Sequence, residues 1–318
     1  MAAPDVTVIV PAHDAAATIG DTLSALAAQE FDGSYEVVVV DDGSSDATGD
    51  LARGAGASVV RHDVALGPAA ARNAGRAAAR GRLLAYTDAD CAPAPDWLAR
   101  GTAALRSADL VQGSVAPVED PGPFDRTLWV SEASPRLYET ANLFVTPEVF
   151  DRVGGFRPFA QPGPGLRPAT GTEHFGEDIV FALEARRAGA TFAFAQDAAV
   201  RHAVFRRGPR GYVAERRRLR YMPALVREVP ELRGSFVAGL FLSQRTARFD
   251  LAVIGIAAAA VTGRRWPLAA VLPYVRTLRR TQPWRRSALR ENAARVAADA
   301  VTCASLVEGS VAARTPVL

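Results

Sequence analysis

Short uninterrupted apolar runs alternate with longer segments whose apolar residues recur every three or four positions. The first run, 6–10, is followed by residues 16–29 with helical spacing, and the runs 37–40 and 83–87 repeat the arrangement. Continuous apolar strands separated by helices are typical of a parallel sheet covered on both faces. The pattern therefore predicts a three-layer α/β domain at the start of the chain.

The same periodicities extend over the rest of this region. They predict further strands at 58–61, 110–115 and 191–195, and further helices at 46–54, 69–80, 124–137 and 176–187. The glycine- and proline-rich residues 154–171 are predicted to form a mobile loop, because such residues interrupt both periods.

The charge balance changes sign along the chain. Residues 1–200 hold 15 arginines against 27 acidic residues, a formal charge of −12, whereas residues 201–318 hold 22 against 7, a charge of +15. A basic region can face an anionic surface, either phospholipid or nucleic acid, and arginines on solvated helix faces are the open alternative. We therefore predict an α/β domain over 1–205 and an arginine-rich helical region over 206–318.

Arginine supplies all 37 basic residues, because the chain contains no lysine. Walker A NTPases, Schiff-base enzymes and lysine-assisted phosphatases are disfavoured, since each needs a lysine. The two cysteines, Cys91 and Cys303, lie far apart and outside any metal-binding spacing, which argues against a disulfide framework and fits a reducing cytoplasm. The run 6–10 ends at Pro11 and polar residues, so it is predicted to be a strand and not a signal peptide.

Acidic residues gather where two predicted strands end. Asp41 and Asp42 follow the second apolar run, and Asp88 and Asp90 follow the third. Ligands of open α/β sheets bind at the carboxyl ends of the strands, so these carboxylates are expected to converge. Residues two apart in an extended chain point to the same side, which predicts that Asp88 and Asp90 together bind Mg²⁺ or Mn²⁺ carrying a diphosphate.

An ordered series of segments resembles the inverting nucleotide-sugar glycosyltransferases of family 2. The series spans roughly residues 5–205 and comprises 8–14 (VIVPAHD), 39–46 (VVDDGSSD), 71–75 (ARNAG), 87–90 (TDAD), 142–144 (NLF), 153–156 (VGGF) and 176–178 (GED). Each segment alone is weak, whereas their order and spacing are specific. The resemblance implies the GT-A fold, a Rossmann-like and mostly parallel sheet between helices, followed here by a helical C-terminal region.

The resemblance also implies a nucleotide pocket. Pro11, Ala12 and Asp14 at the end of the first strand, with Asp41 and Asp42 at the end of the second, are expected to surround the base and ribose. Asp41 is expected to accept a hydrogen bond from the base. Many relatives carry asparagine where this chain has Asp14, which leaves that contact open.

Five more residues match the family's reaction centre. Arg72 is expected to approach the nucleotide or diphosphate, Asp88 the ribose or metal-bound water, and Asp90 the metal itself. Asp178 matches the general base that deprotonates the acceptor hydroxyl, and Glu177 would support acceptor binding. For the last two residues, a helix N-terminus that favours acidic side chains is the alternative.

The four histidines are less defined. His202 follows the last predicted strand, where some GT-A enzymes complete the metal shell, and a surface histidine is the open alternative. His13 can stack under the base, while His62 and His174 are predicted to be solvated loop residues.

Two features of the basic region bear on the acceptor. Residues 215–221 (ERRRLRY) stand where processive synthases of the family carry a Gln-x-x-Arg-Trp motif, and that motif is absent. Together with the expected lack of membrane-spanning helices, this predicts transfer of one or a few sugars. The apolar runs 236–242 and 251–262, flanked by arginines and followed by Trp266, predict an interfacial helix at an anionic membrane, with core packing as the alternative.

Two other classes of protein remain as alternatives. Haloacid-dehalogenase-type phosphatases also place Asp-x-Asp after a strand, but they continue with Thr or Val, where this chain has Cys91. A non-catalytic nucleotide- or RNA-binding protein would interleave aromatic residues with its arginines, and this chain does not. We therefore predict an inverting transferase that needs Mg²⁺ or Mn²⁺ and a UDP-, GDP- or dTDP-sugar. Its acceptor is predicted to be a glycan or lipid-linked, with no nucleic-acid partner and a cytoplasmic place near the inner membrane face.

Overall fold

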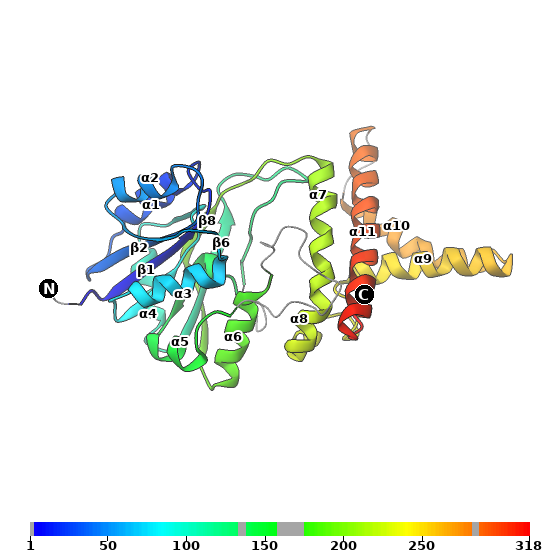
Figure 1. Ribbon diagram of the computed structural model, residues 1–318. Coiled ribbons are helices and arrows are strands. Elements are labelled where there is room, and N and C mark those ends of the chain that lie inside the picture. Colours follow the sequence, from blue (N-terminus) through cyan, green and yellow to red (C-terminus); the bar gives the residue numbers. More distant parts are fainter. Residues whose placement is uncertain (1–2, 133–137, 158–174, 282–285) are drawn as a thin grey trace. The chain divides into compact units, whose positions relative to one another are not determined.

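The computed structural model describes residues 3–132, 138–157, 175–281 and 286–318 (Figure 1). The chain divides into two compact units. Unit 1 comprises Met1–Pro121, Arg126–Phe159 and Gly176–Phe205, and unit 2 comprises Gly122–Asp125, Ala160–Phe175 and Arg206–Leu318. The predicted loop at 154–171 and His174 lie largely outside the described residues.

Unit 1 is built on a mixed sheet whose described strands have the order β3-β2-β1-β4-β7-β6-β8-β5. The strands are β1 (Val6–Ala12), β2 (Tyr35–Asp42), β3 (Ser58–His62), β4 (Leu83–Tyr86), β5 (Cys91–Pro93), β6 (Leu110–Pro117), β7 (Leu143–Val145) and β8 (Phe192–His202). The pairs β1–β2, β1–β4, β2–β3 and β6–β8 are parallel, whereas β7 runs antiparallel to β4 and β6, and β5 antiparallel to β8. Strands β5 and β7 were not predicted, because three residues are too short to show a period.

Helices cover both faces of this sheet, as the apolar runs predicted. They are α1 (Ile19–Ala27), α2 (Thr48–Gly54), α3 (Pro68–Ala78), α4 (Trp97–Ala104), α5 (Pro147–Val153) and α6 (Glu177–Arg187). On β1, Val8 packs in one core cluster with Leu23 of α1 and Trp97 of α4, whereas Ile9 packs in the other with Phe181 of α6. Successive side chains of a strand point to opposite faces, so this division gives three layers and confirms the α/β prediction.

The helix predicted at 124–137 is wrong where the structure describes it. Residues 124–132 form turns and isolated bridges, Arg126 pairing with Phe205 and Val130 with Val115, and residues 133–137 lie outside the described part. The backbone N–H of Val130 donates to the Val115 carbonyl at 2.8 Å. Pairing with β6 and with the residues that follow β8 therefore overrides the helical spacing of this segment.

Unit 2 is helical in its described part. Its elements are α7 (Pro209–Glu215), η2 (Arg216–Tyr221), α8 (Met222–Glu228), η3 (Pro230–Ser235), α9 (Gln244–Thr262), η4 (Trp266–Val271), α10 (Leu272–Thr281) and α11 (Arg286–Ala313). Helix α11 packs on α7, η2 and α8, and a Cβ on Gly309 would lie 2.0 Å from the Arg220 carbonyl oxygen. The apolar run 236–242 forms a turn with a Val237–Phe241 bridge, so it is not the predicted interfacial helix.

Helix α11 also corrects the expectation that the chain has no helix of membrane-spanning length. Over Leu289–Ala313, 25 residues, it is long and apolar enough by length and composition: an 18-residue stretch within it has a mean hydropathy of 1.3, and one third of that stretch is buried. Charged residues recur along this helix and interrupt its apolar residues, so the sequence shows no long uncharged run there. Core helices of soluble proteins pass the same criterion, so length and hydropathy alone do not show that α11 spans a membrane.

Candidate functional site

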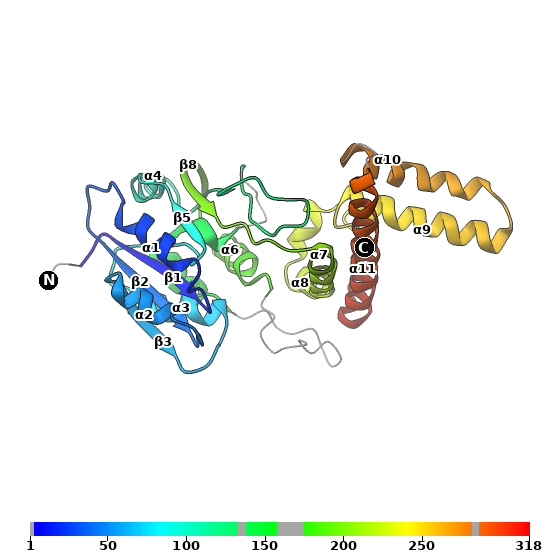
Figure 2. The ribbon, with the colours of Figure 1, turned by 90° about the horizontal axis from the view of Figure 1, so that it is seen from above.

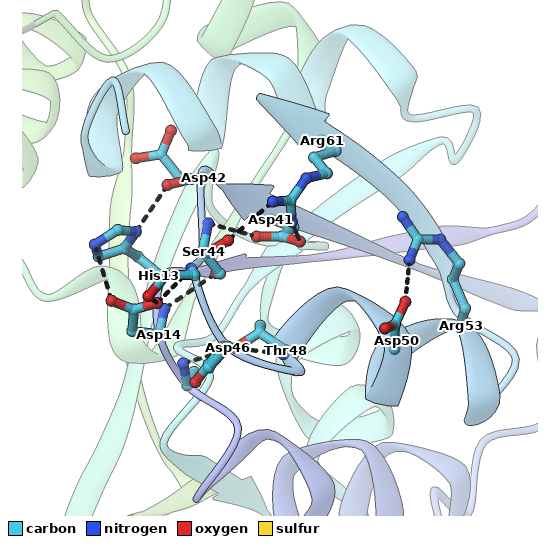
Figure 3. A network of polar contacts seen from close by, with 12 residues as sticks. His13, Asp14, Asp41, Asp42, Ser44, Asp46, Thr48, Asp50, Arg53 and Arg61 are labelled. Carbon is cyan, nitrogen blue, oxygen red and sulfur yellow. Dashed lines mark hydrogen bonds and ion pairs between the residues drawn. The ribbon is translucent and has the colours of Figure 1, made fainter. Parts of the chain in front are cut away.

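A polar network ties together the carboxyl ends of β1 and β2 (Figure 3). Asp14, at a φ of 47°, accepts hydrogen bonds from the N–H and the hydroxyl of Ser45 at 2.7 and 3.1 Å, and the backbone bond lowers the pKa of Asp14. The Asp14 N–H donates to the Ser44 hydroxyl at 3.0 Å. His13 Nδ1 lies 2.8 Å from the Asp42 carbonyl oxygen. The network leaves His13 and the ionised Asp14 exposed at the sheet edge.

Asp41 lies one step deeper in the same network. Its side chain is fully buried, accepts from the Ser44 N–H at 3.0 Å and is ion-paired with Arg61 of β3. Pro11 and Ala12 of β1 stand opposite Val40 and Asp41 of β2. A nucleotide base would reach the Asp41 carboxylate only after Arg61 leaves the pair. Sequence reasoning missed Arg61, because nothing local distinguishes it from the other arginines.

Asp42 holds the loop between β3 and α3. Its carboxylate lies 2.6 Å from His62 Nδ1 and accepts from the backbone N–H groups of Leu66 and Gly67 at 2.9 and 2.7 Å. His62 is therefore mostly buried against a carboxylate, so its predicted solvation is wrong. These three partners occupy the carboxylate oxygens of Asp42. The contact of Asp42 with the nucleotide stays a prediction.

Two of the quoted segments lock onto each other. The Asn73 side-chain amide donates to the Phe156 carbonyl at 2.5 Å and its oxygen accepts from the Phe156 N–H at 2.9 Å. Gly155, at a φ of 79°, lies so close that a Cβ would come within 2.6 Å of Asn73 Oδ1. This lock seats the Phe156 ring 5.5 Å from the Arg72 guanidinium carbon.

Arg72 joins two of the predicted carboxylates. Its Nη1 donates to Glu177 at 3.0 Å and its Nη2 to Asp88 at 3.3 Å, while only 7% of its side chain is exposed. Burial opposes the charged form, but the charges of Asp88, Glu177 and Asp178 outweigh it and raise the pKa of Arg72. The guanidinium therefore connects residues that come from β4 and α6. Its Nε has no hydrogen-bond partner among the described residues, which leaves one buried donor available.

Asp90 and His202 meet because β5 pairs with β8. The Ala203 N–H donates to the Asp90 carbonyl at 2.9 Å, and the His202 Nε2 lies 3.6 Å from the Asp90 carboxylate. His202 Nδ1 lies 2.7 Å from the Ala203 carbonyl oxygen, which requires the hydrogen on Nδ1. In the neutral ring the lone pair of Nε2 then faces Asp90, which is the orientation of a metal-ligating histidine.

The donor set at this point suits a divalent cation. Ligand atoms of Asp90, Cys91 and His202 lie within 4.8 Å of one another. Burial and the charge of Asp88 raise the pKa of Asp90, so the surroundings disfavour a second uncompensated negative charge and would favour a cation beside it. Burial also raises the pKa of Cys91 well above its usual range, which keeps the thiol protonated and unsuited to a hard ion. Carboxylate and imidazole together fit Mg²⁺ or Mn²⁺, Mn²⁺ better because it accepts nitrogen.

Asp178 is the second residue of α6, which begins at Glu177 directly after Gly176, whose φ is 75°. Burial raises the pKa of Asp178 well above its usual range, and the charges of Glu139 and Glu177 raise it further. Its carboxyl is hydrogen-bonded to that of Glu139, whose pKa burial also raises. Two hydrogen-bonded carboxyls whose pKa values are both raised are suited to sharing one proton.

Glu139 is the residue that sequence reasoning missed most clearly. Its N–H donates to the Gln112 side-chain oxygen at 2.7 Å, and Thr87 fixes the same segment through the Ala141 carbonyl at 3.0 Å. The residue precedes the quoted NLF segment, outside any motif, so only the tertiary pairing with α6 identifies it.

The predicted site residues thus fall into three neighbouring groups at the carboxyl ends of the strands. Asp14, Asp41 and Asp42 form the first, Asp90 and His202 the second, and Arg72, Asp88, Glu177 and Asp178 the third. Asp88 connects the last two groups, since its charge affects Asp90 and it binds Arg72.

Comparisons with known proteins agree with this geometry. The family described as "Glycosyl transferase family 2" matches residues 7–162. Glycosyltransferase AglE of Haloferax volcanii is 35% identical over 170 residues, which cover 48% of this chain and 56% of that protein. The succinoglycan biosynthesis protein ExoO of Rhizobium meliloti is 46% identical over 116 residues, 36% of this chain and 32% of that one. The matched region thus spans about half of the first relative and a third of the second.

A solved structure extends the likeness over both units. The mannosyltransferase PcManGT of Pyrobaculum calidifontis, determined with GDP-Man and Mn²⁺, shares 24% sequence identity at a TM-score of 0.60, covering 95% of this chain and 88% of that chain. This likeness shows the GT-A fold. The family match over residues 7–162, just under half of the chain, makes this region similar to glycosyltransferase family 2.

Proposed function

We propose that this protein transfers a sugar from a nucleoside-diphosphate donor to an acceptor hydroxyl, inverting the anomeric centre. The observation that carries the proposal is the meeting of a carboxylate–imidazole pair, Asp90 and His202, and a hydrogen-bonded acid pair, Asp178 and Glu139, at one edge of a GT-A sheet. An inverting displacement needs both a stabilised leaving group and a base on the acceptor side.

On the donor side, Asp90 and His202 would hold Mg²⁺ or Mn²⁺. Such an ion supplies neutralisation of the diphosphate that leaves. Asp88 would face the ribose or a water of the ion, and Arg72, which binds Asp88, adds a fixed positive charge beside the leaving group. Pro11, Ala12, Asp14 and Asp41 would enclose the nucleoside, with Arg61 leaving Asp41 when the base enters.

On the acceptor side, Asp178 would be the general base. In its ionised form Asp178 takes the proton of the acceptor hydroxyl, and burial and the charge of Glu139 make this form more basic than an ordinary carboxylate. The acceptor oxygen then bonds to the anomeric carbon as the bond to the phosphate oxygen breaks, and the nucleoside diphosphate leaves with the electron pair. Glu177, held by Arg72 at 3.0 Å, would orient the acceptor.

The acceptor is proposed to be a glycan or a lipid-linked glycan, met at the cytoplasmic face of a membrane. The two cysteines are free, as a reducing compartment allows. The absence of the processive motif at 215–221 supports the addition of one or a few sugars.

A donor panel tests the reaction. UDP-, GDP- and dTDP-sugars are screened by thermal shift with Mn²⁺, where a ligand at 100 times its Kd stabilises by about 2.7 kcal/mol. With the donor so found, proton NMR follows the anomeric signal of the sugar product. We expect the configuration opposite to that of the donor. Retention, or stabilisation by no donor in the panel, would contradict the proposal.

A further inference from the structure

The far end of unit 2 is a helical hairpin, residues 244–281. Helix α9 ends at Gly263 in the left-handed conformation, φ 67°, and the chain returns through η4 and α10, which both contact α9. Figures 1 and 2 show α9 running away from α11, and Figure 2 shows α10 lying alongside it. The hairpin is therefore an extension of unit 2 with two faces and a tip.

The base of the hairpin is fixed by buried contacts. Phe249 of α9 and Tyr274 of α10 pack edge to face, with ring centres 5.2 Å apart. Arg245 of α9 pairs with Asp299 of α11 through bonds of 2.8 to 3.0 Å, and the Tyr274 hydroxyl donates to the same carboxylate at 2.6 Å. These contacts join the base of the hairpin to α11.

Beyond this base, large apolar side chains face solvent. Eight of them are at least 42% exposed: Leu251, Val253, Ile254, Ile256, Val261, Trp266, Leu268 and Leu272. On α9 the first four point in directions spread around the helix, at 100° per residue, and not along a single stripe. A groove on a protein partner would bury the apolar side chains on one face of α9 and leave the others in water. A lipid layer that surrounds the helix can bury all of them.

The charge of the hairpin indicates which kind of apolar surface it contacts. Residues 251–290 contain eight arginines and no acidic residue. Arg264 and Arg265 stand at the tip of the hairpin, directly before Trp266, whose side chain is 73% exposed. Arginine and tryptophan at the end of an apolar helix are typical of the boundary between headgroups and acyl chains, and arginine favours anionic phosphates.

We propose that the outer part of this hairpin, from Leu251 to Leu272, inserts into the interface of a bilayer that contains anionic phospholipid. The arginines at the tip bind headgroup phosphates and the apolar side chains enter the outer acyl region. The inference extends the membrane placement in the proposed function by naming the surface that makes the contact. Vesicle binding needs neither donor nor acceptor, so its failure is distinguishable from failure of the transferase assignment.

The test is co-sedimentation of the full chain with vesicles of phosphatidylcholine, with and without phosphatidylglycerol. Three exposed valines provide matched aspartate variants: Val261 in the hairpin at 87%, Val311 in α11 at 76%, and Val64 in unit 1 at 64%. Because all three are exposed, each variant should fold, and circular dichroism checks it. We expect Val261→Asp to weaken binding about tenfold and Val64→Asp and Val311→Asp to leave it unchanged. We also expect the double variant Arg264→Gln with Arg265→Gln to lose most of the dependence on phosphatidylglycerol and salt.

Three results would overturn the proposal. The first is absence of binding by the full chain. The second is an equal loss in all three valine variants, or a loss only in Val311→Asp, which would assign the contact to α11. The third is a dimer in sedimentation velocity without vesicles that Val261→Asp dissociates, which would make a second copy the partner of the hairpin. Insertion itself is read from the blue shift of tryptophan emission on vesicles, expected to disappear in Trp266→Phe.

Discussion

The two units use charged side chains in opposite ways. In unit 1 the carboxylates of the site are held in fixed partnerships, and the buried guanidinium of Arg72 contacts both Asp88 and Glu177. In unit 2 the arginines outnumber carboxylates, and those at the hairpin tip are exposed beside exposed apolar residues. Buried, paired charge preorganises a reaction centre, whereas exposed charge of one sign attracts a surface. The contrast predicts that single substitutions in unit 1 affect chemistry and folding, and those in unit 2 affect location.

The largest effect is expected at Asp178. Asp178→Asn cannot take the acceptor proton, so transfer should fall by roughly 10²- to 10⁴-fold in initial-rate assays. Its raised folded pKa means that the native state binds the proton more tightly than the unfolded chain, so stability declines as pH rises above the unfolded pKa. Removing the carboxyl should therefore raise the unfolding temperature at pH 8. A variant that keeps near wild-type transfer would remove Asp178 from the base role.

Arg72 and Arg76 provide a matched pair on one helix. Arg72→Met leaves two carboxylates without their buried partner and should cost about 3 to 5 kcal/mol of unfolding free energy. Arg76 pairs with the exposed Asp151 at 2.7 Å, so Arg76→Met should cost no more than about 1 kcal/mol. Urea unfolding measures both. Equal losses of unfolding free energy would show that the buried contacts of Arg72 stabilise the fold no more than an exposed ion pair does. That result would contradict the distinction between buried and exposed charge.

The corresponding test in unit 2 concerns the base of the hairpin. Arg245→Gln removes a partly buried pair with Asp299 and should cost roughly 1 to 2 kcal/mol locally. Hydrogen exchange followed by mass spectrometry should show faster exchange in peptides of α9 and α10, while peptides of unit 1 stay protected. Arg264→Gln, at the exposed tip, is the control and should leave exchange unchanged. Faster exchange throughout the chain would contradict the separate stability of the two units.

The smallest effect is expected at Glu139. Its charge is one of the causes that raise the pKa of Asp178, together with burial and Glu177, and against Arg72. Glu139→Gln removes that charge and introduces an amide N–H that can donate to the Asp178 carboxylate, so the pKa of Asp178 falls and its base form appears at lower pH. The acid limb of the pH–rate profile should move down by roughly one pH unit. An unmoved limb with a lower plateau would assign Glu139 a packing role only.

Much of unit 1 could be predicted from its sequence because its strands and its chemistry are local. Apolar runs of four or five residues end in carboxylates, and the sheet then brings those ends together. The locks between motifs were not predictable in the same way: Asn73 binds the backbone of Phe156, and Asn142 binds carbonyls of Ser114 and Ala198 at 2.8 and 2.7 Å. Their spacing along the chain carries no sign of that contact.

What the sequence did not predict depends on partners distant in the chain. Glu139 contacts Asp178, and Arg61 contacts Asp41, only in the folded sheet. Residues 124–132 have the apolar spacing of a helix but form isolated bridges to Val115 and Phe205. In unit 2, apolar residues spread around α9 lack the one-sided period that separates core from surface, so only the structure distinguishes the buried base of the hairpin from its exposed end.

The most direct test of the account is calorimetric titration of UDP, GDP and dTDP in the presence of Mn²⁺. The account predicts that one of them binds, that EDTA or Asp90→Ala weakens it at least about a hundredfold, and that Cys91→Ser and Asp178→Asn leave its affinity within about twofold. That pattern would separate a metal-dependent donor site from the base beside it. Affinity that survives both EDTA and Asp90→Ala, or that is lost in Asp178→Asn, would contradict it.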